Sequence, residues 1–155
     1  METTWEILVA SPDLEMRRSI VTILTRLGVD AICASTVEQC REVLAKNYVG
    51  LVFSDRHFPD GTYLDLLAPA GSTPGEKPRI VLTTYCIDPA EYHTARLSGV
   101  FEVISSPCHS TAVEWMVIQA MRDDRKRRRQ DPVIQPANVA RMAKAKAAAA
   151  FAGKI

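Results

Sequence analysis

The chain has 155 residues, of which 47% are hydrophobic and 24% are charged, and its formal net charge is +1. These values are close to the average for globular proteins and favour a soluble folded domain. The apolar runs are too short to span a membrane, and the first residues lack the features of a secretory signal, so we expect a cytoplasmic protein with no membrane contact.

The net charge conceals an uneven distribution. Residues 1–121 carry 9 Lys and Arg against 15 Asp and Glu, whereas residues 122–155 carry 10 against 3. We therefore expect a folded domain over residues 5–121 and a basic tail, rich in Ala, Lys and Arg and either helical or disordered, over residues 122–155. The tail is shorter than a typical DNA-binding output domain and has no helix-turn-helix or zinc spacing, so nucleic-acid binding through it is a subsidiary hypothesis.

Short apolar runs alternate with amphipathic segments along the chain. The run over residues 6–10 predicts a buried strand that ends before Pro12, and apolar positions three and four apart predict a helix over 13–27, with Gly28 as its stop. The pattern then repeats, with strands predicted over 30–34, 48–54, 79–84 and 100–104 and helices starting near residues 36, 63, 89 and 110. A Pro- and Gly-rich stretch over 69–75 predicts a loop.

This alternation predicts an α/β fold, a doubly wound parallel sheet of five strands with helices on both faces. The carboxyl ends of parallel strands lie at one edge of the sheet, where such folds bind their ligands. We therefore expect one shallow crevice at this edge, formed by Ser11, Pro12 and Asp13 after the first strand, Asp55 after the third, Thr83 and Thr84 after the fourth, and Ser106 after the fifth.

One stretch is more specific than the rest. Residues 51–67 run from an apolar strand through Asp55 to Pro59, Asp60-Gly61 and a Leu-rich helix start. With residues 80–85, residues 99–104 and Ser106-Pro107, this stretch resembles the receiver domains of bacterial two-component response regulators over about residues 5–121. The resemblance implies the flavodoxin-like (βα)5 receiver fold, and it makes Ser106-Pro107 a candidate cis peptide.

The resemblance also implies a chemistry. In that family the Asp after the third strand accepts a phosphoryl group from a histidine kinase, two acidic residues after the first strand hold Mg²⁺, and a Lys after the fifth strand pairs with the phosphoryl oxygens. Asp55 occupies the acceptor position and Thr83 supplies the expected hydroxyl. Ser11 and Pro12 stand where the acidic pair belongs, and Ser106 stands at the position of the Lys.

Three interpretations of Asp55 remain open. In the first, the chain is an atypical receiver that signals by protein contact and does not depend on phosphorylation. In the second, Asp55 is a working phosphoacceptor that shares a reduced Mg²⁺ site with Asp13. In the third, Asp55 only caps its turn near Phe58 or Pro59. None of them makes the chain an enzyme, and we expect no cofactor, because the sequence shows no nucleophile and base pair, Gly-rich phosphate loop or metal cluster.

The fifth strand and the last helix bear on signalling. Val103 stands where the family usually has an aromatic ring that moves on phosphorylation, and a β-branched side chain is too stiff to copy that motion. On the last helix, Trp115 and Ile118 lie off the face that is directed at the sheet. We expect them to form an interface with a second copy of the chain or with a protein partner, such as a histidine kinase or an output protein.

Overall fold

The computed structural model describes residues 5–67, 78–86 and 88–130, with side chains as far as Lys126. The chain divides into two compact units, residues 1–120 and 121–155, and each is described by itself. The predicted loop over residues 69–75 and the tail beyond residue 130 lie outside the described residues. No helix in the described part of the chain is both long and apolar enough to cross a membrane.

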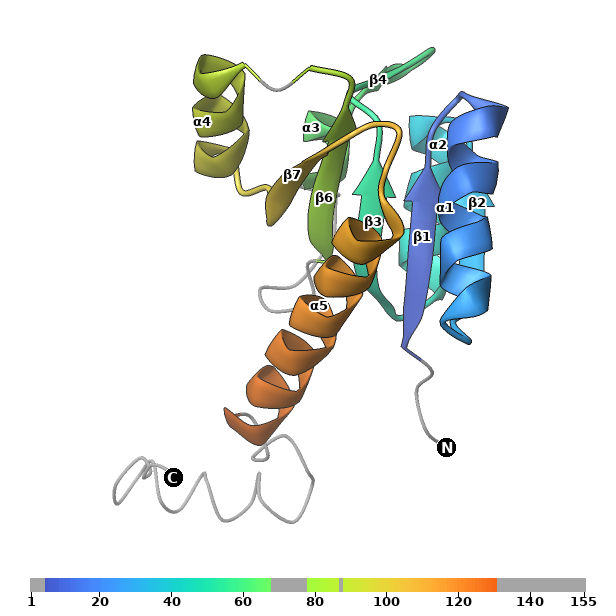
Figure 1. The fold of residues 1–155 in the computed structure, drawn as a ribbon, viewed down its shortest axis with the longest axis vertical. Coiled ribbons are helices and arrows are strands. Elements are labelled where there is room, and N and C mark those ends of the chain that lie inside the picture. The colour runs from blue at the N-terminus through green and yellow to red at the C-terminus, as the bar shows by residue number, and fades with distance from the viewer. Residues whose placement is uncertain (1–4, 68–77, 87, 131–155) are drawn as a thin grey trace. The chain divides into compact units, whose positions relative to one another are not determined.

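The first unit is built on a parallel sheet of five strands, as predicted (Figure 1). The strand order is β2-β1-β3-β6-β7. The strands are β1 (Glu6–Ala10), β2 (Ala31–Ala34), β3 (Val49–Ser54), β6 (Arg79–Thr84) and β7 (Glu102–Ser105). β7 begins two residues later than predicted. Before it, the N–H of Val100 donates to the carbonyl of Ala95 on α4, and the N–H of Phe101 donates to the carbonyl of Ile80 on β6.

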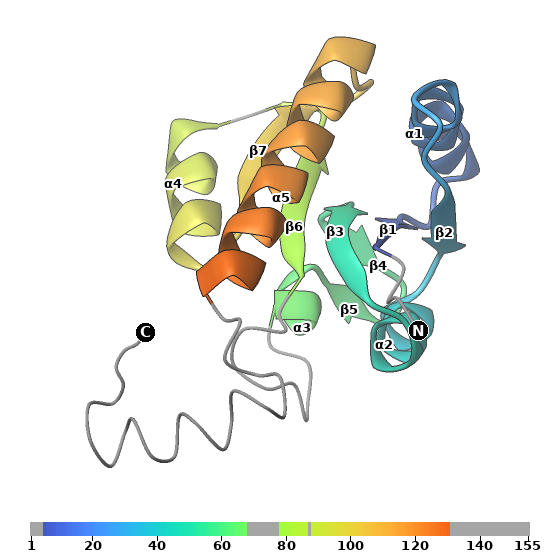
Figure 2. The same ribbon diagram turned by 90° about the horizontal axis from the view of Figure 1, so that it is seen from below.

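In the part of the chain that the structure describes, five helices accompany the strands. They are α1 (Leu14–Arg26), α2 (Val37–Lys46), α3 (Leu64–Leu67), α4 (Pro89–Leu97) and α5 (Ser110–Gln130). α1 begins at the cap residue Asp13, and Gly28 follows its end with a φ of 75°, a conformation that glycine adopts at little cost. Figure 2 shows α1 on one side of the sheet and α2 and α3 on the other.

The two faces of the sheet are buried by alternate residues of the same strands. Ile7, Val9 and Phe53 pack with α1 and with the part of α5 before residue 121, whereas Leu8 and Val52 pack with α2 and α3. Residues 7–10 of β1 and 51–53 of β3 are therefore all apolar, which explains why these stretches show no alternation. A third cluster, formed by Leu82, Ala95, Val100 and Val103, lies between α4 and the strands β6 and β7.

A small hairpin after β3 was not predicted. β4 (His57–Phe58) and β5 (Gly61–Thr62) form an antiparallel pair. In the turn between them, Asp60 accepts hydrogen bonds from the backbone N–H groups of Val37 at 2.8 Å and Glu38 at 3.1 Å. The hairpin thereby supplies a second cap to α2 and is anchored beside the end of β3.

In the second unit, α5 continues through the basic stretch as far as Gln130. Basic side chains near a helix C-terminus interact favourably with the helix dipole. Asp124, in this stretch, is buried.

Candidate functional site

Asp55 lies at the carboxyl end of the sheet, directly after the fully buried strand β3. Its backbone N–H donates to the carbonyl of Ala10, the last residue of β1, at 2.9 Å. This bond continues the pairing of the two strands by one residue and fixes where the side chain leaves the sheet. The residue is half-buried, so its carboxylate is open to solvent on one side.

The carboxylate of Asp55 is held by neutral donors. The hydroxyl of Ser11, a fully buried residue, donates to Asp55 Oδ2 at 3.1 Å, and the N–H of Arg56 donates to Oδ1 at 2.8 Å. The third interpretation, a cap of the turn near Phe58 or Pro59, is met in a different place: one oxygen of the carboxylate accepts from Arg56 at the start of the turn, and the other accepts from Ser11 after β1. The sequence placed Ser11 and Asp55 at the same edge of the sheet, and the structure brings them into direct contact.

Arg17 adds a positive charge that the sequence interpretation missed. Its Nη1 donates to the carbonyl of Ser11 at 2.6 Å. The guanidinium comes from the first turn and a half of α1 and reaches back over the end of β1. An Arg one helical turn after the cap residue Asp13 is the only sequence signal for this contact, and it does not distinguish Arg17 from the neighbouring, exposed Arg18.

The Asp13 side chain caps helix α1 and does not contact Asp55 through any recorded hydrogen bond within the described residues. It is the N-cap of α1, and its Oδ1 accepts a hydrogen bond from the N–H of Glu15 at 2.9 Å. The backbone N–H of Asp13 donates in turn to Ser11 Oγ at 3.0 Å. Ser11, Asp13 and Asp55 are thus linked in one short hydrogen-bonded chain, in which the Ser11 hydroxyl contacts both of the others.

These residues do not fit a Mg²⁺ ion. Mg²⁺ in proteins is held by carboxylates and by water in a near-octahedral shell. Here a hydroxyl and a proline replace the acidic pair, the Asp13 carboxylate caps a helix, and a guanidinium is bonded to the Ser11 carbonyl. Across the described ranges, no group of three or more His, Cys, Asp or Glu residues is arranged to bind a metal ion.

Thr83 lies near the end of β6, and Ser106 follows the neighbouring strand β7. The hydroxyl of Thr83, which is buried, donates to the carbonyl of Ser54, the residue before Asp55, at 3.2 Å. The backbone N–H of Ser106 donates to the carbonyl of Thr84 at 2.8 Å, and the Ser106-Pro107 peptide is cis, as the resemblance suggested. Ser106 lines a cavity with Asp13 and Tyr85 that does not include Asp55.

A salt bridge connects the residue after Asp55 to helix α4. Arg56, the residue after Asp55, pairs with Glu91 through two contacts of 3.0 and 3.1 Å. The pair is partly exposed, and it lines a cavity of about 310 Å³ between α4, the strands β6 and β7, and the segment around the β4–β5 hairpin. This pair could not be predicted from the sequence pattern, since its members are 35 residues apart.

The predicted interface residues are exposed. The exposed fraction is 52% for Trp115 and 37% for Ile118, whereas Val113, Met116 and Val117 of the same helix are buried. The helical periodicity therefore separates the buried and exposed faces of this part of α5 correctly.

The sequence is similar to that of a known response regulator. The sequence is 27% identical over 116 residues to the response regulator protein PilR of Pseudomonas aeruginosa. That match covers 74% of this chain and 26% of PilR, so the chain spans about a quarter of the length of this curated relative. No protein-family model matches the sequence.

Solved receiver structures share the fold. A signal receiver domain of an HD domain-containing protein from Pseudomonas fluorescens Pf-5 superposes with a TM-score of 0.72 at 21% identity, covering 84% of this chain and 96% of that one. A two-component response regulator from Clostridium difficile gives 0.67 at 19%, covering 77% and 97%. The beryllofluoride-activated NtrC4 receiver domain dimer gives 0.66 at 16%, covering 76% and 97%.

Proposed function

The chain has the fold and the sequence likeness of a response-regulator receiver domain, and we propose that it signals by protein contact without phosphorylation of Asp55. In this proposal the domain catalyses no reaction. The single observation that carries it is the hydrogen bond from the Ser11 hydroxyl to the Asp55 carboxylate, at the position where the family has an acidic residue.

The chemistry of phosphoryl transfer supports this proposal. Transfer to a carboxylate brings negative charges together, and a divalent cation and a lysine normally compensate them. Ser11, Pro12 and Ser106 supply no charge. The two nearby guanidinium groups already have partners, since Arg17 bonds to the Ser11 carbonyl and Arg56 pairs with Glu91. Losing one such electrostatic contact typically costs about 3–4 kcal/mol of transition-state stabilisation.

A titration with a phosphoryl mimic tests the proposal. The protein is incubated with Mg²⁺ and beryllofluoride, and amide chemical shifts are followed by NMR. We expect no saturable change around Asp55 or Thr83, because the mimic needs the same cation and lysine as the phosphoryl group. Saturable changes centred on Asp55 would contradict the proposal and support the working phosphoacceptor instead.

A gain-of-function variant provides the matched control. The triple substitution Ser11→Asp, Pro12→Asp and Ser106→Lys restores the family's acidic pair and lysine around Asp55. We expect this variant to respond to beryllofluoride with Mg²⁺, and we expect the response to disappear when Asp55→Asn is added. A response in the triple variant alone shows that the receiver fold is competent and that the three natural residues are what prevents the reaction.

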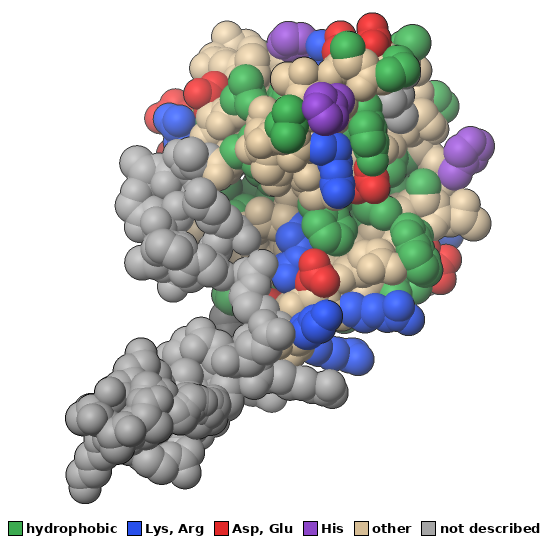
Figure 3. Space-filling view, turned by 90° about the vertical axis from the view of Figure 1, so that its left-hand side faces the viewer, with side chains coloured by type: hydrophobic (Ala, Val, Ile, Leu, Met, Phe, Trp, Pro, Cys, Tyr) green, Lys and Arg blue, Asp and Glu red, His purple; other side chains and the backbone are tan. Residues whose placement is uncertain are grey.

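The surface for protein contact is proposed on the helices that flank the edge strand β7. Exposed hydrophobic side chains lie on α4, at Leu97 and Tyr92, and on α5, at Trp115 and Ile118. Figure 3 views the molecule from the α4 side and shows hydrophobic side chains among charged ones on that face. Large apolar side chains that stay exposed on a folded domain commonly mark an interface. We propose a second copy of the chain, a histidine kinase or an output protein as the partner.

A further inference from the structure

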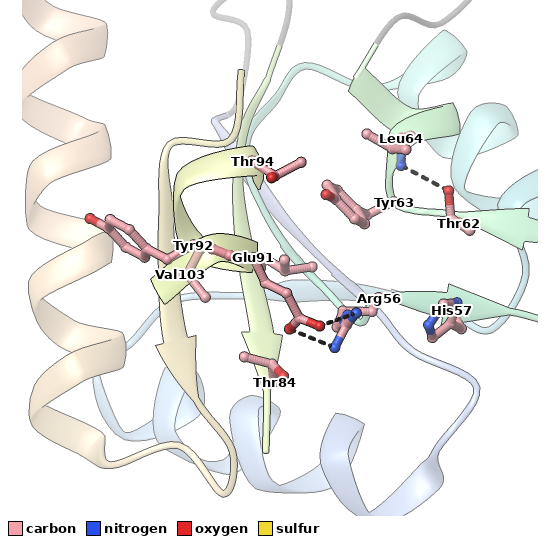
Figure 4. Close-up of a pocket in the computed structure, with 12 residues that line it drawn as sticks. Arg56, His57, Thr62, Tyr63, Leu64, Thr84, Glu91, Tyr92, Thr94 and Val103 are labelled. Atoms are coloured by element: carbon pink, nitrogen blue, oxygen red, sulfur yellow. Dashed lines mark hydrogen bonds and ion pairs between the residues drawn. The ribbon is translucent and has the colours of Figure 1, made fainter. Parts of the chain in front are cut away.

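The cavity beside Arg56 has walls from four parts of the first unit. It measures about 310 Å³, the lower end of the range of about 300–1,000 Å³ that is typical of small-molecule sites. Figure 4 shows α4 with Glu91 and Thr94 on one side, Tyr63 and Leu64 near α3 on another, and Val103 on β7. All of these elements lie within residues 56–103, so the cavity belongs to the first unit alone.

The interior of the cavity is mainly apolar. Leu82 and Val103 line it and are buried in the cluster that joins α4 to the sheet, and Tyr63 packs against the same cluster. The Tyr63 ring offers a flat surface on which another aromatic ring can pack, which is worth about 0.5–1.5 kcal/mol beyond the area that it buries. This wall favours an aromatic occupant over a flexible aliphatic one.

Polar side chains also line the cavity, and two of their hydroxyls matter for an occupant. The Thr84 hydroxyl donates to the carbonyl of Cys86 at 3.1 Å and can still accept a hydrogen bond. Within the described part of the chain the Thr94 hydroxyl has no hydrogen-bond partner, and it lines the cavity from the α4 side. An occupant with one N–H or O–H group can therefore be oriented at either hydroxyl.

The ion pair of Arg56 with Glu91 favours a neutral occupant of the cavity. Arg56 and Glu91 line the cavity and neutralise one another through their paired contacts. An anionic ligand would compete with Glu91 for the guanidinium, and a cationic one would compete with Arg56 for the carboxylate. A neutral molecule leaves the pair intact and avoids the cost of exposing either charge to an apolar surface.

We propose that this cavity binds a small, neutral aromatic molecule that carries one hydrogen-bonding N–H or O–H group. The proposal rests on three features of one cavity: its mainly apolar interior with an aromatic wall, the hydroxyls of Thr84 and Thr94, and the ion pair of Arg56 with Glu91. Binding as such does not depend on the proposed function of Asp55.

An occupant of the cavity would contact the elements around Asp55. Arg56 follows Asp55, Thr84 follows Thr83, and α4 is tied to the edge strand β7 by the hydrogen bond from the Tyr92 hydroxyl to Glu102 at 2.9 Å. A ligand that prefers one arrangement of α4 shifts the population toward it. The cavity can thus supply the input that phosphorylation supplies elsewhere, and this regulatory step rests on the proposed function.

The test uses indole as the probe, titrated into the full chain while amide chemical shifts are followed. We expect saturable shifts for residues 56–64, 82–84 and 90–94 at indole concentrations up to about 10 mM, the range in which a small fragment binds detectably. Benzoate, which is aromatic but anionic, should bind at least about tenfold more weakly because it competes with Glu91.

Thr94→Phe provides the decisive variant, because Thr94 lines the cavity from an exposed position on α4 where a larger side chain does not threaten the core. We expect this change to raise the dissociation constant for indole at least about tenfold. The matched control is His93→Phe, the same substitution at the exposed neighbour that does not line the cavity, and it should leave binding within about twofold.

Val103→Phe fills the cavity from the strand side and should weaken binding in the same way. Absence of saturable shifts, equal binding by the Thr94→Phe and His93→Phe proteins, or tighter binding of benzoate would overturn the proposal. Because these shifts report binding directly, a negative result leaves the beryllofluoride experiment on Asp55 unaffected, and a positive result does not presuppose its outcome.

Discussion

At Ser11, a hydroxyl stands where the resemblance to receiver domains implies a carboxylate. Ser11 brings no charge to Asp55, and its Oγ donates to the Asp55 carboxylate and accepts from the N–H of Asp13. A second carboxylate there would need a cation to balance it. The hydrogen bonds of Ser11 join Asp55 and Asp13 without an ion. The acidic pair and the lysine are therefore restored together in the triple variant.

The four cysteines differ in their exposure to solvent. Cys33 and Cys86 are exposed, whereas burial raises the pKa of Cys40 to about 12 and that of Cys108 to about 11. Since the thiolate is the reactive form, Cys33 and Cys86 should react with an aromatic disulfide reagent at about pH 8 at least about 100-fold faster than the other two.

Counting the released thiolate by absorbance checks this expectation. The Cys33→Ser and Cys86→Ser proteins should each lose one equivalent of the fast reaction, whereas Cys40→Ser should lose none. A third fast equivalent in the folded protein would show that Cys40 or Cys108 is more accessible than the structure indicates.

At the scale of elements, the β4–β5 hairpin and α2 are joined by one carboxylate. The N–H of Val37, and to a smaller extent that of Glu38, hold the pKa of Asp60 below its ordinary value of 3.8. A carboxyl whose pKa is lower in the folded than in the unfolded chain stabilises the fold above the unfolded pKa, and this contribution is lost as the pH falls through the folded pKa.

Asp60→Asn should therefore lower the free energy of unfolding at neutral pH, and the difference from the natural protein should narrow as the pH falls below about 4. Denaturant unfolding followed by circular dichroism at several pH values measures it. Asp30→Asn, at an exposed position between α1 and β2, is the matched control and should show a smaller effect at neutral pH. A difference that is constant with pH would contradict the role of the Asp60 charge.

At the scale of the whole molecule, the chain combines an acidic part over residues 1–121, with net charge −6, and a basic part over residues 122–155, with net charge +7. Such a segment can attract a polyanion or an acidic protein surface, and its attraction weakens with salt. Nucleic-acid binding by residues 122–155 stays a prediction, because most of this segment lies outside the described residues.

Self-association is the prediction that belongs to this scale. If Trp115 and Ile118 form a dimer interface, light scattering should give twice the chain mass of 17.1 kDa, and the double substitution Trp115→Ala and Ile118→Ala should return the mass to that of one chain. Two large apolar side chains commonly account for a substantial part of an interface energy.

Leu64→Ala is the control for this experiment. Leu64 is 50% exposed on α3, away from α5 in the sequence, and its substitution should leave the mass unchanged. A one-chain mass for the natural protein, or a dimer that survives the double substitution, would argue against this interface and leave a different partner as the occupant of the surface.

The sequence by itself determined the sheet and its edge. Continuous apolar runs such as residues 51–54 define buried parallel strands, and parallel strands necessarily bring Ser11, Asp55, Thr83 and Ser106 to one end. A local signal also placed the end of α1, at Gly28, because helix termination depends on residues close in the chain. The short β4–β5 hairpin was not predicted because strands of two residues show almost no periodic pattern in the sequence.

Only the tertiary structure decided which neighbours at that edge touch. That Ser11 donates to Asp55 while Asp13 caps α1, that Arg17 reaches the Ser11 carbonyl, and that Arg56 pairs with Glu91 all depend on side-chain directions between segments far apart in the chain. The cavity of about 310 Å³ arises in the same way, from the spacing of α4 and the hairpin around Val103. Sequence periodicity fixes which face a residue occupies, but packing fixes what it meets there.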